Sequence, residues 1–452
     1  MRSRRSKMLA RLSKRLSSRD SRQSTVVSLL SLPSELLIIV VDWAGLLDES
    51  VDTLFATRLS CRSLRDASWP LFINRYFQKR SHFLGEDSLQ CLVDISQHPI
   101  LGPCVSSLDI SLRRIALDKV ATLPLNPGIW PRELKPKIPD DVALLLDKAM
   151  LNLRNCRSVS IVGPAAMRWK PAPWGVNRFT QALDREYGKG GWRYDPFKSP
   201  YLDRSSVVDY TLYVVLSAVS KSAVELHAFS IDFERGDYYN NFYVDHDSII
   251  GSIPLGLSEQ FRNLQKLSLD LKAIITSPKP YQPSSLPTQL IDLAPNLTEL
   301  SLGFSGKEIC DGTLLRLAEH SSELPPLKSL CLTECSANLD PFVAFLRSHK
   351  KTLRSLTLIF FRILSTYPAG DAKDEINPWG DVIKTLRELD LDYLSIHSSL
   401  LDTNCVEFFN KEGVGVYSVL VYAAGVEKVR KTLGEIAGVR RLGSVDTSIR
   451  QE

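Results

Sequence analysis

The stretch LTELSL, residues 297–302, decides the fold, because its spacing of leucines recurs along the chain at a nearly regular interval. The central leucines of five such copies, from Leu267 to Leu389, are separated by 33, 30, 26 and 33 residues. Self-similarity at this period predicts stacked units, each with one short strand whose leucines face inward. The other strong copies are VSSLDI (105–110), LQKLSL (264–269), LKSLCL (327–332), LRSLTL (353–358) and LRELDL (386–391), and the weaker copies are CRSVSI (156–161) and LHAFSI (226–231).

Helical patterns alternate with these strands, as in TLLRLAEH (313–320) and DPFVAFLRSHKK (340–351). Units of strand, loop, helix and return bury their apolar sides only against neighbouring units, as in a solenoid. A doubly wound α/β sheet would also alternate strand and helix, but the sequence has no glycine-rich nucleotide loop. We therefore predict an α+β or α/β solenoid, in which a short all-helical domain precedes a leucine-rich-repeat-like β/α horseshoe over residues 104–452. A strand and a helix within residues 416–438 would cap it.

Residues 163–205 interrupt the array with a long segment rich in proline, glycine and aromatic residues. Loops of this length are usually functional or disordered, and Trp, Tyr and Arg together are typical of protein interfaces. The aromatic residues would alternatively only pin the loop to the array, and both interpretations stay open. The candidate target-binding residues in this loop are Trp169, Trp174, Trp192 and Tyr194.

A second informative stretch, LSLPSELLIIVVDWAG at residues 30–45, predicts a helix with Pro33 and Glu35 in its first turn, where both are favourable. The helix is apolar nearly all round, whereas a surface helix normally has one apolar stripe. One face can pack on a second helix within residues 49–68, and the other needs a partner chain or the rest of this chain. The two faces carry Leu36, Ile39, Val40 and Trp43 on one side and Leu37, Ile38 and Val41 on the other.

The composition is that of a folded protein for which we expect no membrane association. Of 452 residues, 44% are hydrophobic and 24% are charged. The apolar run at 36–41 is far shorter than the roughly 20 residues that cross a bilayer, and the N-terminus has no apolar signal core. The eight cysteines show no paired spacing. They suggest free thiols in a reducing compartment, which places the protein in the cytoplasm, the nucleus or both.

Residues 1–26 form a basic, serine-rich tail. Nine Lys or Arg and one Asp lie within residues 1–25, which leaves 47 basic and 50 acidic side chains in a nearly neutral remainder. We interpret the tail as solvated and disordered. A nuclear-import or nucleic-acid-binding patch ranks second, and a mitochondrial presequence ranks third. The neutral remainder argues against nucleic acid as the main partner.

A longer pattern joins the predicted helices: Leu-Pro-x-Glu-Leu, an apolar run, and then Leu-x-x-x-Arg-Leu-x-Cys-Arg-x-Leu. It matches at Leu32, Pro33, Glu35, Leu36, Leu54, Arg58, Leu59, Cys61, Arg62 and Leu64. With this pattern, residues 27–80 resemble an F-box in the form found in many fungal proteins, over about one tenth of the chain. The helical linker expected at 81–103 and the repeats after it resemble the later parts of that family. Trp43-Ala44-Gly45 departs from the usual polar end of the first helix.

The resemblance implies a substrate-recognition adaptor of an SCF-type ubiquitin ligase. Its F-box would dock on a Skp-type adaptor, and through it on a cullin, while the repeats would bind a target protein. An alternative is a leucine-rich-repeat scaffold that acts independently of any ubiquitin ligase. The docking residues implied by the resemblance are Leu32, Pro33, Glu35, Leu36, Ile39, Val40, Trp43, Leu54, Leu59, Cys61 and Leu64.

Catalytic motifs are absent from the sequence: it contains no G-x-S-x-G, no P-loop and no H-E-x-x-H. Cys331 and Cys335 lie four residues apart, but no second pair is near them in the sequence. We place Cys331 at an inward position of its repeat, where a buried thiol is a better interpretation than a zinc ligand. The chain is therefore expected to be a non-enzyme without a metal or cofactor.

Overall fold

The computed structural model divides the chain into two compact units, Met1–Phe77 and Gln78–Glu452, which we call the N-terminal unit and the repeat domain. No helix among the described residues has the length and apolar character needed to cross a membrane. The described residues are 29–47, 51–111, 140–162, 204–232, 254, 256–271, 286–304, 311–319, 326–364, 378–397, 400–401, 404–409, 415–417, 420–436 and 438–444.

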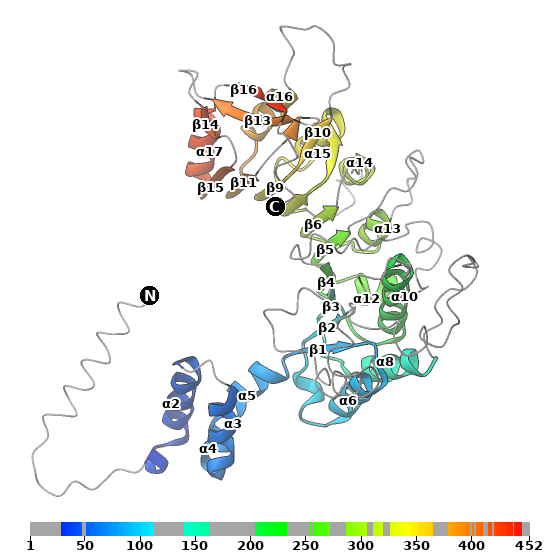
Figure 1. Ribbon diagram of the computed structural model, residues 1–452, viewed down its shortest axis with the longest axis vertical. Helices are drawn as coiled ribbons and strands as arrows, with labels where there is room; N and C mark the ends of the chain where they lie inside the picture. The colour runs from blue at the N-terminus through cyan, green and yellow to red at the C-terminus, as the bar shows by residue number, and fades with distance from the viewer. Residues whose placement is uncertain are drawn as a thin grey trace, which may run out of the picture. The chain divides into compact units, whose positions relative to one another are not determined.

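The described part of the N-terminal unit is helical (Figure 1). The helix expected within residues 49–68 is divided in two by Cys61, whose backbone is extended (φ −160°, ψ 167°) and caps the second piece. Pro70 lies in the first turn of the last helix, where its missing N–H costs nothing. The elements are η1 (Leu29–Ser31), α2 (Ser34–Leu47), α3 (Val51–Ser60), α4 (Arg62–Ala67) and α5 (Trp69–Tyr76).

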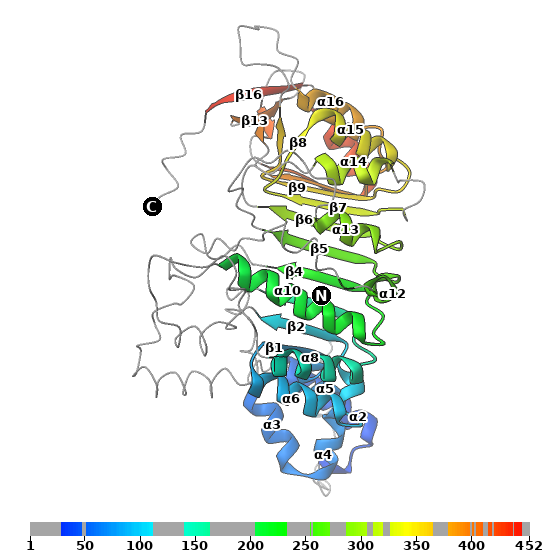
Figure 2. The same ribbon diagram turned by 90° about the vertical axis from the view of Figure 1, so that its right-hand side faces the viewer.

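The repeat domain is built on a ten-stranded sheet in the part of the chain that is described. Its strands pair in chain order and are parallel, except for the last, which is antiparallel to its neighbour. Figure 2 shows the strands stacked along the domain with helices over one face. The strands are β1 (Lys79–Phe83), β2 (Ser107–Ser111), β3 (Ser158–Val162), β4 (Ala228–Asp232), β5 (Lys266–Leu271), β6 (Glu299–Phe304), β7 (Ser329–Thr333), β9 (Ser355–Ile359), β11 (Tyr393–His397) and β15 (Leu420–Ala424).

Strand register confirms the predicted leucine ladder. Leu267 pairs with Leu300, and Leu300 pairs with Leu330. The weaker copies take the same register, because Val159 pairs with both Leu108 and Phe229. All of these side chains are at most 2% exposed, so the stack of strands carries one continuous apolar interior.

Two predictions about the ends of the ladder are wrong. LRELDL does not form the strand that its leucine pattern predicts, because α16 (Pro378–Leu386) includes its first leucine. The next similar stretch, LDYLSI (391–396), forms β11 instead, with Leu394 paired to Leu356. Residues 81–103 are also no separate linker, since β1 and α6 (Glu86–Gln97) belong to the repeat domain.

Most consecutive helices of the array contact one another, and asparagine side chains join successive repeats. The side-chain amide of Asn155 donates to the Pro103 carbonyl at 2.8 Å, and that of Asn296 donates to the Arg262 carbonyl at 2.7 Å. These bonds satisfy backbone carbonyls in the turns that precede β2 and β5. The remaining helices of the array are η2 (Gly102–Cys104), α8 (Asp140–Asn152), α10 (Arg204–Lys221), α12 (Leu257–Phe261), α13 (Leu286–Asp292), α14 (Asp311–Glu319) and α15 (Leu339–Ser348).

A second sheet accompanies the C-terminal repeats. It has the order β14-β13-β12-β10-β8, with β16 also paired to β13. The predicted terminal strand and helix are present as β15 and α17 (Val426–Glu435), and Arg387 donates hydrogen bonds to the carbonyls of Leu433 and Ile436 near the end of α17. The second sheet consists of β8 (Ser336–Asn338), β10 (Arg362–Leu364), β12 (Leu400–Leu401), β13 (Asn404–Phe409), β14 (Gly415–Tyr417) and β16 (Gly438–Ser444).

Candidate functional site

Helix α2 has the two apolar faces that its sequence predicts, and one of them is internal. Leu37 and Val41 are buried in one cluster with Ala67 of α4. Ile38 and Leu64 pack against the same cluster. Burying these side chains holds α2 on α4, at roughly 1.5–3 kcal/mol for each fully buried large aliphatic group. This face is therefore used within the N-terminal unit itself.

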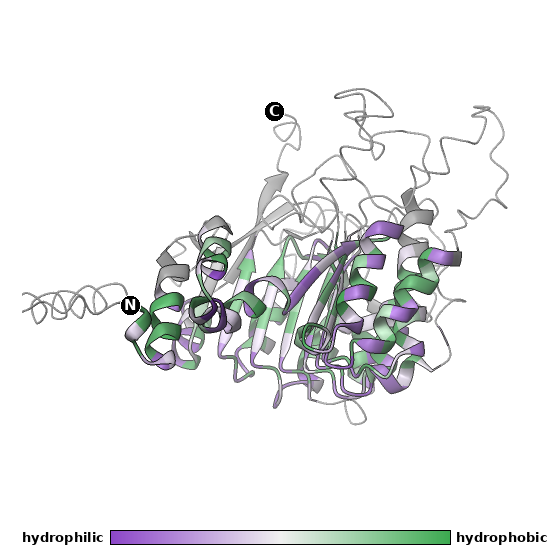
Figure 3. Cartoon of the chain, turned by 90° about the horizontal axis from the view of Figure 1, so that it is seen from below, coloured by the Kyte–Doolittle hydropathy of each residue, from purple (hydrophilic) through white to green (hydrophobic). Residues whose placement is uncertain are grey.

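The opposite face of α2 is exposed although it is apolar. Leu36 is 46% exposed, Ile39 is 51% exposed, and Val40 is exposed beside them. On α3, Leu59 is 85% exposed. We call Leu36, Ile39, Val40 and Leu59 the exposed apolar set. Figure 3, in which hydrophobic residues are green, shows how apolar the helices of this unit are.

The remaining residues of the predicted docking surface divide into three groups. Pro33 and Glu35 are exposed at the start of α2, where the Pro33 carbonyl accepts hydrogen bonds from the N–H groups of Leu36 and Leu37 at 3.0 Å. Trp43 and Cys61 are half-buried. The half-buried side chains of Leu32 and Leu64 pack on the internal cluster.

Leu54 requires a correction, because it is only 4% exposed. It belongs to the inside of the N-terminal unit rather than to a free surface. The motif pattern contains leucines that hold the helices together as well as leucines that face outward. Burial in the structure distinguishes the two kinds of leucine, and the motif pattern does not encode burial.

The sequence patterns above do not predict an aromatic cluster that lies between α3 and α5. Phe72 is its centre, with ring centroids 5.8 Å from Phe55, 6.0 Å from Trp69 and 5.2 Å from Tyr76. The spacing of Trp69, Phe72 and Tyr76, at i, i+3 and i+7, is the helical signal that could have revealed it. This cluster attaches α3 to α5, and Leu71 of the same α5 packs against the aliphatic cluster under α2.

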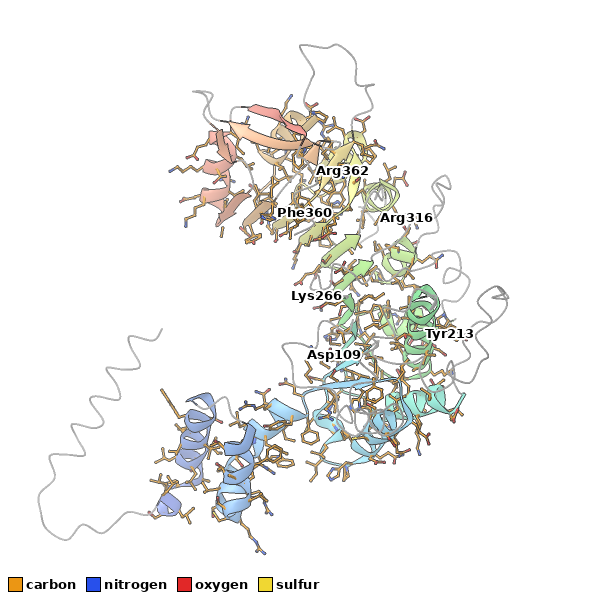
Figure 4. The ribbon with its side chains drawn as sticks, in the orientation of Figure 1. Asp109, Tyr213, Lys266, Arg316, Phe360 and Arg362 are labelled. Carbon is orange, nitrogen blue, oxygen red and sulfur yellow. The ribbon has the colours of Figure 1, made fainter. Side chains whose placement is uncertain are left out.

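The open face of the ten-stranded sheet, away from its helices, carries a row of small polar side chains. Ser160, Ser230, Ser268 and Ser301 occupy equivalent positions on neighbouring strands. The Ser230 hydroxyl donates to the Ser160 hydroxyl at 2.7 Å. Figure 4 shows Lys266 on this side of the sheet, and Tyr213 and Arg316 on the helical side. The candidate target-binding residues Trp169, Trp174, Trp192 and Tyr194 lie outside the described residues.

Cys331 lies in the same row, which corrects its predicted inward position. Leu330 and Leu332 on either side of it are fully buried, so Cys331 points to the open face and is only half-buried. Cys156, by contrast, is buried at an inward position, and burial raises the pKa of its thiol to about 12. Within the described ranges, no group of three or more His, Cys, Asp or Glu side chains is arranged to hold a metal ion.

The first strand places polar side chains where the other strands have apolar ones. Arg80 pairs with Leu108, and His82 pairs with Ile110. His82 is fully buried, with Nδ1 2.8 Å from the Ser88 carbonyl, and its Nε2 has no hydrogen-bond partner among the residues described. Burial, with a smaller contribution from the Arg80 charge, lowers the pKa of His82 to about 3, although the Ser88 hydrogen bond partly opposes the shift. His82 is therefore neutral at physiological pH.

Comparisons with known proteins give distant likenesses. The chain matches no protein-family model and no curated protein. A chain of the crystal structure of the Rad7 and Elc1 complex in yeast is 13% identical, with 88% of this chain and 85% of that chain covered and a TM-score of 0.28. LegL7, a leucine-rich repeat-containing protein from Legionella pneumophila, is 14% identical, with 81% of this chain and 100% of that chain covered and a TM-score of 0.22. The repeat architecture is established by the strand register of this chain itself.

Proposed function

We propose that the chain is a substrate-recognition adaptor of an SCF-type ubiquitin ligase. In this proposal the N-terminal unit docks on a Skp-type adaptor, which links it to a cullin, and the repeat domain binds a target protein. The chain itself carries out no chemistry and acts in the cytoplasm, the nucleus or both.

The observation that carries the proposal is the exposed apolar set beside a complete internal cluster. Leu37 and Val41 already fill the contact with α4, so Leu36, Ile39 and Val40 are not needed to hold the unit together. Apolar side chains gathered in this way on a helical surface are typical of protein interaction sites. The F-box resemblance of the same residues supports a Skp-type adaptor as the partner.

The test is direct binding of the purified full-length chain to a purified Skp-type adaptor. Leu36→Asp and Ile39→Asp should each weaken binding by at least about tenfold, because a carboxylate would be desolvated in an apolar contact. Leu144→Asp is the matched control, since Leu144 is 63% exposed on α8 of the repeat domain. It should bind like the wild type.

Failure of the wild-type chain to bind the adaptor would overturn the proposal. The leucine-rich-repeat scaffold would then be favoured, because it uses the repeat domain and requires no adaptor. Equal weakening by Leu36→Asp and Leu144→Asp would show that the binding does not depend on α2.

A further inference from the structure

The two helices that carry the exposed apolar set are held in different ways. Helix α2 is attached through the aliphatic cluster of Leu37, Val41 and Ala67. Helix α3 reaches α5 through Phe55, which contacts Phe72, and through Arg58, the residue next to the exposed Leu59. The orientation of α3, and with it that of Leu59, therefore depends on a contact to which α2 contributes no side chain, although Leu71 of α5 also packs against the cluster under α2.

Arg58 lies at the centre of this contact. Its guanidinium carbon lies 3.9 Å from the ring centroid of Phe72 and 5.1 Å from that of Trp69. The same group donates hydrogen bonds to the Arg65 carbonyl at 3.2 Å and to the Ser68 hydroxyl at 3.4 Å. One side chain of α3 thus contacts the end of α4 and the first turns of α5.

The chemistry of this contact suits arginine in particular. A planar guanidinium can stack on an aromatic face and donate in its own plane at the same time. A lysine ammonium could keep the charge, but it could not make both contacts in this geometry. A methionine would keep much of the length and lose both the stacking charge and the hydrogen bonds.

We propose that Arg58 is a positioning residue for partner docking: it fixes α3 on α5 so that Leu59 is presented to the adaptor. This inference rests on the proposed function. It goes beyond it by assigning α3 a separate support, whose loss should affect Leu59 and leave the α2 face in place.

Hydrogen exchange on the free full-length chain tests the support without any partner. Arg58→Met should raise exchange of the amides of α3 by about tenfold and leave those of α2 unchanged. Arg62→Met is the matched control, because Arg62 is exposed one position after the break between α3 and α4. Unchanged exchange in α3, or an equal rise in α2, would overturn the inference.

A double-mutant cycle with the purified Skp-type adaptor tests the link to docking. Arg58→Met should weaken binding by about tenfold in the wild-type and Leu36→Ala backgrounds, and by less than about twofold in the Leu59→Ala background. Equal losses in all three backgrounds would show that Arg58 only stabilises the unit. Tight binding unaffected by Arg58→Met would overturn the inference alone, whereas no binding by the wild type would overturn the proposed function as well.

Discussion

His82 is a neutral imidazole at a position where the other parallel strands of the sheet have apolar side chains. Its folded pKa lies below its ordinary value, so the unfolded chain binds more protons between about pH 6.5 and about pH 3. Its contribution to stability is therefore complete above this window and declines as the pH falls through it, by up to about 1.4 kcal/mol per pH unit.

We expect His82→Leu to remove this dependence, because leucine would continue the apolar ladder and leave no buried Nε2. Urea unfolding of the full-length chain at pH 7 and pH 5 would measure the change in free energy of unfolding. The wild type should lose more stability at pH 5 than the variant does. His227→Leu, at an exposed position, should retain the wild-type loss. Identical losses in wild type and His82→Leu would contradict the argument.

Arg80 and His82 also show that a pattern of apolar residues is insufficient to locate every strand. Both residues hide β1 from an apolar pattern search, so the sequence predicts a boundary between the helical domain and a linker within this strand. Conversely, LRELDL has the pattern but begins inside α16, and the less regular LDYLSI forms the strand. Cooperative pairing with the preceding strand decides such cases, and one repeat in isolation does not encode it.

Each strand of the ladder is an element with one buried and one open face. Leu300 is 2% exposed between Leu267 and Leu330, whereas Ser301 is half-buried on the open face. Leu300→Ala should therefore lower the free energy of unfolding of the repeat domain by about 3 kcal/mol through lost burial and a cavity. Ser301→Ala should change it by about 0.5 kcal/mol or less.

Urea unfolding monitored by far-UV circular dichroism would compare the two variants. Similar losses of stability would contradict the strand register, because they would require Ser301 to be as well packed as Leu300. A large loss for Ser301→Ala alone would mean that the faces of β6 are reversed.

Helical periodicity predicts the two faces of α2, because both are apolar; the structure shows that one packs on the internal cluster and that the other is exposed. It did not predict that Leu54 is internal, since α3 carries Leu54, Phe55 and Leu59 with no single apolar stripe. The aromatic cluster depends on contacts between α3 and α5, which short-range spacing does not describe. The repeat pattern describes the inward residues only, so it does not predict the row of serines on the open face.

At the scale of the whole molecule, each of the two units has its own core. The aliphatic cluster with Leu37 lies in the N-terminal unit, and the ladder with Leu300 lies in the repeat domain. Units with separate cores fold as separate domains. We therefore expect the proposed docking activity and the stability of the ladder to respond independently to core substitutions.

Leu37→Ala should leave a cavity between α2 and α4 and lower the stability of the N-terminal unit by about 2–5 kcal/mol. Because α2 is then held less firmly, the variant should also bind the Skp-type adaptor more weakly. It should leave the urea midpoint of the repeat domain unchanged. Leu300→Ala should lower that midpoint and leave adaptor affinity at 25 °C unchanged. Both quantities can be measured on the same full-length preparations. Loss of adaptor affinity in Leu300→Ala would contradict independence, because the ladder would then have to support the docking surface of the N-terminal unit.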